Sequence, residues 1–388
     1  MIRLLAKFFI KDYDKKTDPK VRQKYGILSG AVGIFFNLCL FTGKFIAGML
    51  SGAISITADA FNNLSDAGSS IVTMIGFRMA GQKPDPEHPF GHGRIEYLAG
   101  LIVSMLVILM GFELMKSSFT KIMHPEKTEF SILIACILIA SILVKMYMYF
   151  YNQSLSKQLD SVAMHSTAID SFSDTIATSA VLASSIFTYF TNISIDGWTG
   201  LAVAVFIIYS GFTAAIDTVN PLLGQAPSKE FIHEIRKVVM SYEGILGVHD
   251  LVVHDYGPGR RMVSLHAEVP ADVDILKAHD TIDNIEMRLS REYGIEAVIH
   301  MDPVSVSDPE TNELKGKVQK LVAALGEGFN FHDFRIVKGD SHTNVLFDVV
   351  VPYTTKMTDE EVIQRLRTEV RAINVKYRCI INVDRDYT

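Results

Sequence analysis

The sequence has little cysteine and no excess of positive charge. It also lacks two common functional motifs, one for nucleotide binding and one for zinc proteolysis. Its three cysteines, Cys39, Cys136 and Cys379, are scattered and form no CxxC pair, which excludes a disulfide framework and favours a reducing environment. A net charge of -6 without a basic domain gives no basis for nucleic-acid binding. The chain lacks the GxxxxGK[ST] loop of nucleotide-driven pumps and the HExxH helix of metalloproteases. We expect no cleavable signal peptide, because the first apolar stretch is short and breaks into charge.

What the sequence does have is long apolar runs. Hydrophobic residues make up 48% of the 388 residues. The mean hydropathy is +0.23, which suits a membrane protein with a sizeable soluble part. About 20 apolar residues are needed to cross a bilayer. Six segments meet that need: 26–50, 53–77, 96–118, 130–150, 165–190 and 198–218.

The charge distribution predicts the orientation of these spans. An even number of spans places both termini on one side of the membrane. The N-terminal 25 residues contain many basic residues, and basic segments are typical of the cytoplasmic side, so this side is predicted to be the cytoplasm. The basic residues are Arg3, Lys7, Lys11, Lys15, Lys16, Lys20, Arg22 and Lys24. Lys116, Lys121 and Lys127, between the third and fourth spans, weaken the asymmetry. We therefore predict a multi-pass protein of the cell membrane with cytoplasmic N- and C-termini.

After 220-NPLLGQAP-227 the pattern changes to amphipathic helices and short alternating strands. The predicted order is one αββαβ unit, which is the order of a ferredoxin-like α+β domain. Its elements are a helix at 228–242, strands at 246–256 and 261–269, a helix at 273–293 and a strand at 295–302.

The chain then repeats this unit. The segment 249-HDLVVHDYGPGRRMVSLHAEVP-270 matches 332-HDFRIVKGDSHTNVLFDVVVP-352, and 297-AVIHMDP-303 matches 379-CIINVDR-385. A shared order of elements and shared ends predict a duplication. The predicted domains are a six-helix transmembrane bundle at 1–223, a cytoplasmic αββαβ domain at 224–303 and a second copy at 304–388.

Two of the predicted spans carry paired oxygen ligands. Asn62 and Asp66 are separated by four residues, as are Asp170 and Asp174, so each pair shares one helix face. Asp59 lies three residues before Asn62 and also fits that face. Carboxylates inside a membrane are rare and mark ion or proton pathways, although a water-filled vestibule or helix capping is the alternative. Without a cation such a cluster would repel itself. The pattern predicts a metal site of three carboxylates and one amide.

These features together resemble the cation diffusion facilitator family. The loop 88-HPFGHGRIEYLAG-100 is similar to the signature loop of that family, and His-Asp at 249 with 300-HMD-302 is similar to its cytoplasmic domain. The resemblance covers about residues 1–303. It implies a homodimer in a lipid membrane that exchanges a divalent metal for protons. The transport site that it implies consists of Asn62, Asp66, Asp170 and Asp174.

The resemblance implies two further metal sites. One lies in the loop before the third span and contains Asp85, His88 and His92; the alternative is a rigid turn with solvated or capping histidines. The other is a binuclear cytoplasmic site that ties two subunits together, where the alternative is a set of surface histidines. Its residues are His249, His266, His279, His300 and Asp302.

The second αββαβ unit keeps only part of the cytoplasmic pattern. His332 stands at the position of His249, and Asp384 stands at that of Asp302. The other positions hold Asp348, Asn382 and either Glu360 or Glu361. This set is an oxygen-richer version or a decayed one, and we expect decay into a structural or dimer-extending role.

Two lysines fall within predicted spans, Lys44 and Lys145. Each either pairs with an acid in the bundle or extends to the membrane interface. Lys145 lies near a span end, so we expect its ammonium group to reach the interface.

The ligand types favour manganese as the transported metal. Oxygen ligands suit Mn²⁺, whereas imidazole favours Zn²⁺, and the transport site contains no histidine. This combination resembles the manganese branch of the family, with Fe²⁺, Co²⁺ and Zn²⁺ as alternatives. Exporting a divalent ion against 100 mV costs about 4.6 kcal/mol, at about 2.3 kcal/mol per charge.

Because a nucleotide-binding loop is absent, we expect protons to drive export, through carboxylates that release metal when protonated. The prediction is a secondary transporter working by alternating access, with no catalytic residues. A regulatory metal ion bound by the cytoplasmic domain is a further expectation. A membrane-anchored metal sensor and an intramembrane metal-dependent hydrolase are the alternatives from other classes.

Overall fold

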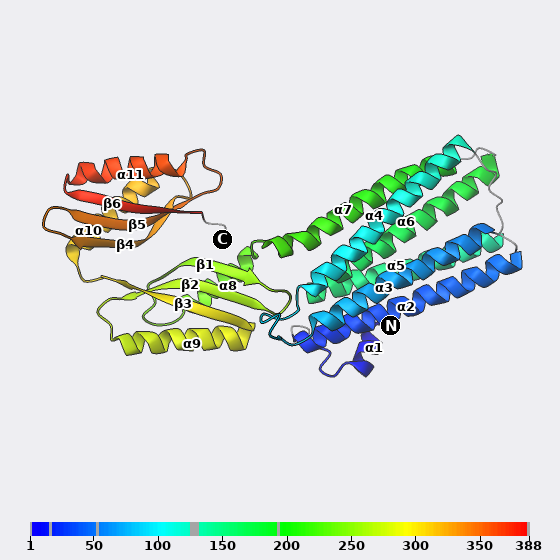
Figure 1. The fold of residues 1–388 in the computed structure, drawn as a ribbon, viewed down its shortest axis with the longest axis horizontal. Helices are drawn as coiled ribbons and strands as arrows, with labels where there is room; N and C mark the ends of the chain where they lie inside the picture. The colour runs from blue at the N-terminus through cyan, green and yellow to red at the C-terminus, as the bar shows by residue number, and fades with distance from the viewer. Residues whose placement is uncertain (1, 15–17, 52–53, 125–131, 192–194, 386–388) are drawn as a thin grey trace. The chain divides into compact units, whose positions relative to one another are not determined.

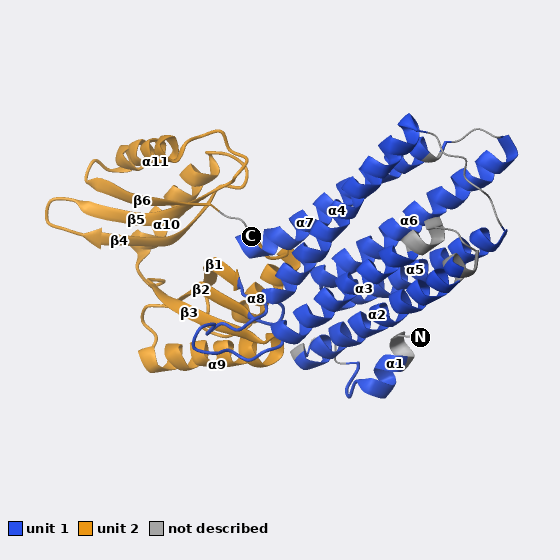
Figure 2. Cartoon of the chain, turned by 45° about the vertical axis from the view of Figure 1, so that its right-hand side comes forward, with its two compact units in different colours: residues 1–225, 255–260 blue, residues 226–254, 261–388 orange. Residues whose placement is uncertain are grey.

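The computed structural model describes residues 2–14, 18–51, 54–124, 132–191 and 195–385 (Figure 1). It divides into two compact units (Figure 2). Residues 1–225 and 255–260 form the first, which we call the helical unit. Residues 226–254 and 261–388 form the second, which we call the tail unit.

Among the described residues, the helical unit contains one short helix and six long ones. Their bounds are α1 Ile2–Phe9, α2 Pro19–Ser51, α3 Ile54–Ala80, α4 Ile95–Met123, α5 Ile132–Leu159, α6 Val162–Thr191 and α7 Asp196–Leu223. The shortest of the six has 27 residues. A helix of that length extends about 40 Å, which exceeds the roughly 30 Å hydrocarbon core of a bilayer. In both views α2 to α7 run alongside one another as a bundle (Figures 1 and 2).

Four helices in the described residues are long and apolar enough to cross a membrane. They are Lys20–Ile46, Ile95–Met123, Ile132–Leu159 and Gly197–Leu223, which confirms four of the predicted spans. The predicted second and fifth spans correspond to α3 and α6. These helices are less apolar because they carry the carboxylates and many hydroxyl side chains. That they also cross the membrane stays a prediction.

Helix α2 packs tightly against α3 because glycines line their contact. A methyl group added at Gly26 would lie 2.0 Å from Phe77 Cγ, and one at Gly30 would lie 2.6 Å from Met74 Cβ. Small residues let helix backbones approach closely, which is how helices associate in lipid. The close approach fixes the position of α3, the helix that carries Asp66.

The tail unit contains the αββαβ order twice, as predicted. The first set is α8 Lys229–Met240, β1 Gly247–Asp255, β2 Arg261–Pro270, α9 Ile275–Tyr293 and β3 Ile295–Val304. The second set is α10 Pro309–Ala323, β4 Asn330–Lys338, β5 Thr343–Val351, α11 Asp359–Ile373 and β6 Tyr377–Arg385. We call these sets the first and second repeats.

Each repeat forms its own three-stranded sheet and its own core. The strand orders are β1-β2-β3 and β4-β5-β6, and the last two strands of each sheet are parallel. The first core includes Leu265 and Ile285, and the second includes Phe347 and Leu366. Helices α9 and α11 lie on the outer sides of the two sheets (Figure 1).

The repeats also share an unusual backbone conformation. Asp250 and Asp333, each directly after the matching histidine, have φ angles of 49° and 51°. A left-handed conformation at a residue other than glycine costs of order 1–3 kcal/mol and tends to occur at functional sites. Asp333 lies between His332 and Arg335, where the register of the pairing between β4 and β5 shifts. The duplication therefore extends to a left-handed residue inside a strand, directly after a histidine.

Candidate metal centres

Three carboxylates meet inside the helical unit. Asp66 comes from α3, whereas Asp170 and Asp174 come from successive turns of α6. Each offers an oxygen within 4.8 Å of the others. Asp66 and Asp170 are only 3% and 4% exposed. The structure thus brings together the three predicted acidic ligands, which we call the carboxylate centre.

A buried lysine contacts this centre. Lys145 Nζ of α5 donates to Asp66 Oδ2 at 2.7 Å and to Asp174 Oδ2 at 2.6 Å. The expectation that Lys145 reaches the membrane interface is therefore wrong. A charge in the interior of a bundle is tolerated when it is paired, and here two carboxylates surround the ammonium group. Three carboxylates and one ammonium leave two formal negative charges, which is the charge that one divalent cation neutralises.

The amide of the predicted site is placed differently. Asn62 lies one helical turn before Asp66 on α3, and its side chain is exposed. The side chain of Asp59, which the sequence places near the same face, lies outside the described part of the structure. The role of Asn62 as a fourth ligand stays a prediction.

The loop before α4 brings its three predicted ligands together. His88 Nδ1 lies 3.2 Å from Asp85 Oδ1, and His92 Nε2 lies 3.3 Å from Asp85 Oδ2. The backbone N–H of His88 donates to Asp85 and lowers the pKa of that carboxyl, which both imidazoles lower further. An ionised carboxylate and two imidazoles together form a set of cation ligands.

The same loop contacts the turn 255–260, which belongs to the helical unit. Arg94 Nη2 donates to the carbonyl oxygen of Asp255 at 2.8 Å, and Phe90 stacks on Tyr256 with ring centroids 4.5 Å apart. A methyl group at Gly257, where φ is 108°, would lie 2.3 Å from the Gly93 backbone. Glycine is required there because of both its conformation and the close approach. Sequence reasoning treated this turn only as a hairpin.

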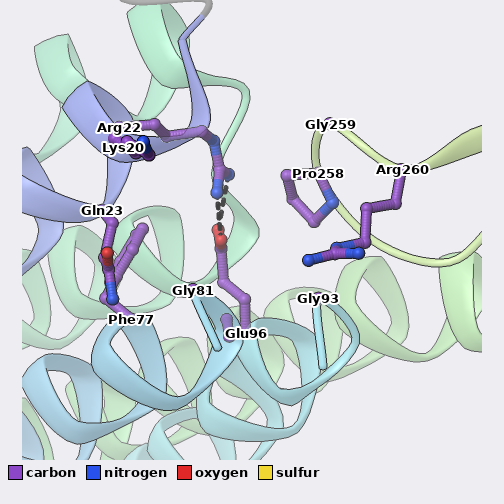
Figure 3. A pocket seen from close by; sticks show the side chains of 11 residues that line it. Lys20, Arg22, Gln23, Phe77, Gly81, Gly93, Glu96, Pro258, Gly259 and Arg260 are labelled. Atoms are coloured by element: carbon purple, nitrogen blue, oxygen red, sulfur yellow. Dashed lines mark hydrogen bonds and ion pairs between the residues drawn. The ribbon is translucent and has the colours of Figure 1, made fainter. Parts of the chain in front are cut away.

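Beside this contact lies a pocket whose wall holds a buried ion pair (Figure 3). Arg22 of α2 donates through both terminal nitrogens to the carboxylate of Glu96, which is fully buried at the start of α4. Ser161 Oγ also donates to Glu96, at 2.6 Å. Sequence reasoning missed this ion pair, although Glu96 lies inside the signature loop.

In the first repeat, two histidines and a carboxylate form a group. His266 Nδ1 and His249 Nε2 lie 2.8 Å and 3.2 Å from the same oxygen of Asp302. His300 Nε2 lies 3.4 Å from the other oxygen, with its side chain exposed. His279 is not brought to this group within one chain, because it lies on the exposed face of α9 and contacts Asp283. The structure therefore groups three of the five predicted residues, and His300 contacts only the aspartate of that group.

In the second repeat, the matching positions also converge. His332, Asp348 and Asp384 offer ligand atoms within 4.8 Å of one another. Asn382 is not among them and instead donates to Asp348. Glu361 caps α11 by accepting from the backbone N–H of Thr358, which explains an acid near the position of His279. The convergence argues against the expected decay of this repeat.

The pKa values of the two matching histidines are shifted in opposite directions. Burial lowers the pKa of His249, but the hydrogen bond with Asp250 and the nearby carboxylates raise it above its usual value. Burial lowers the pKa of His332, and the adjacent His249 lowers it further. A neutral imidazole is the form that binds a metal, so His332 is the better prepared of the two.

Two protein-family models match successive regions of the chain. Residues 31–223 match the model of the cation efflux transmembrane domain. Residues 227–304 match the model of the cation efflux protein cytoplasmic domain. Both matched regions end before the second repeat.

Several characterised and uncharacterised proteins are similar over most of their length. An uncharacterized transporter of Methanocaldococcus jannaschii, MJ0449, is 31% identical over 70% of this chain and 96% of its own. The cation-efflux pump FieF of Pectobacterium atrosepticum is 27% identical over 69% of this chain and 89% of its own. The cation-efflux pump FieF of Escherichia fergusonii is 26% identical over 68% of this chain and 88% of its own.

Proposed function

This chain belongs to the cation diffusion facilitator family of membrane efflux proteins, and from that premise we propose that it exports Mn²⁺ from the cytoplasm in exchange for protons. The observation that carries the proposal is the carboxylate centre with its lysine. Buried carboxylates within a helical bundle are costly unless they serve an ion or proton pathway. Two formal negative charges remain after Lys145 is counted, which fits one divalent ion.

The chemistry of the ligands supports manganese over its neighbours. Asp66, Asp170 and Asp174 offer only oxygen, and Asn62 would add another oxygen. Hard oxygen ligands suit Mn²⁺, whereas zinc sites favour imidazole and thiolate. The Irving–Williams order still favours Zn²⁺ at many sites, so Fe²⁺, Co²⁺ and Zn²⁺ are the competing substrates.

Proton exchange follows from the same side chains. A carboxylate holds a cation when ionised and loses affinity for it when protonated. Asp66, Asp170 and Asp174 would therefore carry metal in one direction and protons in the other. Lys145 would stabilise the centre between these events by pairing with the carboxylates that the metal has left. The centre would be exposed to each side of the membrane in turn.

The setting that we propose is the cell membrane, with both termini in the cytoplasm and two chains in a homodimer. The basic N-terminal segment supports the orientation. The match to the cytoplasmic domain of efflux proteins supports the placement of the tail unit. A regulatory metal in the first repeat, on His249, His266 and Asp302, would be separate from the transported ion.

The metal groups of the tail unit also support a second candidate, a metal sensor anchored by its helices. A sensor binds metal without moving it, so transport separates the two. No observation favours an intramembrane hydrolase.

Mn²⁺ uptake by proteoliposomes under an imposed pH gradient tests the proposal. Asp66→Ala and Asp174→Ala should each abolish uptake, because each removes a ligand and a proton carrier. Asp217→Ala is the matched control, since Asp217 is an exposed carboxylate of α7. Full uptake by either of the first two variants would refute the site, and no uptake by the intact protein would favour the sensor.

A further inference from the structure

The two repeats of the tail unit meet at their matching histidines. The rings of His249 and His332 stack with centroids 4.3 Å apart and an angle of 17°. Both side chains are about nine-tenths buried. Among the described residues, no group lies in hydrogen-bond geometry with His249 Nε2 or with either ring nitrogen of His332. Buried polar atoms without partners destabilise a fold, so they require an explanation.

Carboxylates surround these nitrogens at a spacing that a metal would explain. Asp250 Oδ1 and Asp384 Oδ2 each lie 3.3 Å from His332 Nε2. Ligand atoms that are about 2.1 Å from a common ion lie about 3–4.2 Å from one another. Asp348 completes a group with His332 and Asp384 whose ligand atoms all lie within 4.8 Å of each other. These contacts match neighbouring ligands better than hydrogen bonds.

The residues behind this group orient it. Asn382 Nδ2 donates to Asp348 Oδ1 at 2.8 Å, which directs the other carboxylate oxygen. His249 Nδ1 lies 3.3 Å from Asp250 Oδ2 and leaves Oδ1 directed at His332. Hydrogen bonds from outside orient metal ligands in this way. The left-handed backbone of Asp250 is a further cost that an aimed carboxylate would explain.

We propose that the second repeat holds its own divalent-cation site, formed by His332, Asp348 and Asp384 and completed by Asp250 of the first repeat. One imidazole and three carboxylates make a hard ligand set, which suits Mn²⁺ or Fe²⁺ better than Zn²⁺. It shares no ligand with the group of His249, His266 and Asp302 in the first repeat, but it adjoins that group, because His249 also lies within reach of Asp250 and His332. It does not depend on the transport activity proposed above.

The site would join the two repeats. Three ligands come from β4, β5 and β6, and the fourth comes from β1. A cation bound by both repeats stabilises the arrangement in which they face each other, since separating them would remove a ligand. A cation bound at this site would therefore hold the two repeats of one chain together.

Mn²⁺ titration of the full-length protein in detergent, followed by the electron paramagnetic resonance signal of free Mn²⁺, tests this site. The background variant carries Asp66→Ala and Asp174→Ala, so transport and its failure do not affect the result. In that background His332→Ala and Asp384→Asn should each remove one bound Mn²⁺ per chain. The matched control is His342→Ala, because His342 lies in the turn between β4 and β5 and contacts Ser341.

Hydrogen exchange of the same samples guards against a folding defect. Mn²⁺ should slow exchange in β4 of the background protein and of His342→Ala, but not of His332→Ala or Asp384→Asn. Without metal, the β4 amides of Asp384→Asn should exchange at the rate of the background protein, because asparagine has nearly the same shape as aspartate. Unaltered Mn²⁺ stoichiometry and protection in Asp384→Asn would overturn the proposal.

Discussion

Lys145 is the residue that most changes the chemistry of the carboxylate centre. The spacing of Asp170 and Asp174 predicted a shared face because four residues complete about one helical turn. No such rule connects Lys145 to them, since it lies on α5 and reaches the centre only through tertiary packing. From sequence its position near a span end favoured the interface. In the structure the ammonium group occupies the space between two carboxylates, where a metal would compete with it.

Replacing this lysine should strengthen metal binding. Lys145→Met removes a tethered cation, so we expect Mn²⁺ to bind about tenfold more tightly, a change of about 1.4 kcal/mol. Turnover should fall, because the emptied carboxylates lose the group that stabilises them. Mn²⁺ titration and proteoliposome uptake measure the two effects.

The matched control for that variant is Lys157→Met, which changes an exposed lysine of the same helix. It should bind Mn²⁺ like the intact protein. Weaker Mn²⁺ binding by Lys145→Met would show that the lysine assists the metal instead of competing with it.

At the scale of elements, the ion pair of Arg22 and Glu96 joins the starts of α2 and α4. Glu96 is fully buried, and Ser161 at the start of α6 also donates to it. Removing one partner of a buried ion pair leaves the other charge uncompensated, at a cost of about 3–5 kcal/mol. Three helices of the bundle therefore depend on one carboxylate near the signature loop.

Glu96→Ala should accordingly lower the free energy of unfolding by about 3–5 kcal/mol. Glu113→Ala, an exposed change in the same helix, should stay within about 0.5 kcal/mol of the intact protein. Thermal unfolding in detergent compares the two variants. Equal unfolding temperatures would contradict a structural role for this ion pair.

The elements themselves were largely predictable, but their partners were not. Amphipathic periodicity located the helices and strands of both repeats, because one face of each element must be buried. Periodicity does not identify what covers that face. The stacking of His249 on His332 and the contact between Arg94 and Asp255 join positions far apart in the chain. Asn62 was predicted to be as central as Asp66, yet an exposed position on α3 leaves its contribution to be tested.

At the scale of the whole molecule, the chain places groups of candidate cation ligands in both of its units. The helical unit has a carboxylate centre whose residual charge matches one metal ion. The tail unit has three groups of histidine and aspartate, one in each repeat and one that contains residues of both. The matched family regions include only the first of these repeats. The second repeat therefore lies outside both matched regions, and its proposed cation site is an addition of this chain to them.

Competitive uptake by proteoliposomes of the intact protein tests the central claim most directly. Equal concentrations of Mn²⁺, Fe²⁺ and Zn²⁺ are offered without oxygen, under an imposed pH gradient and after an ionophore has collapsed it. Coupled export through oxygen ligands predicts that Mn²⁺ enters fastest and that its entry stops with the gradient. Mn²⁺ entry that continues at the same rate without the gradient, or entry of Zn²⁺ alone, would contradict the account.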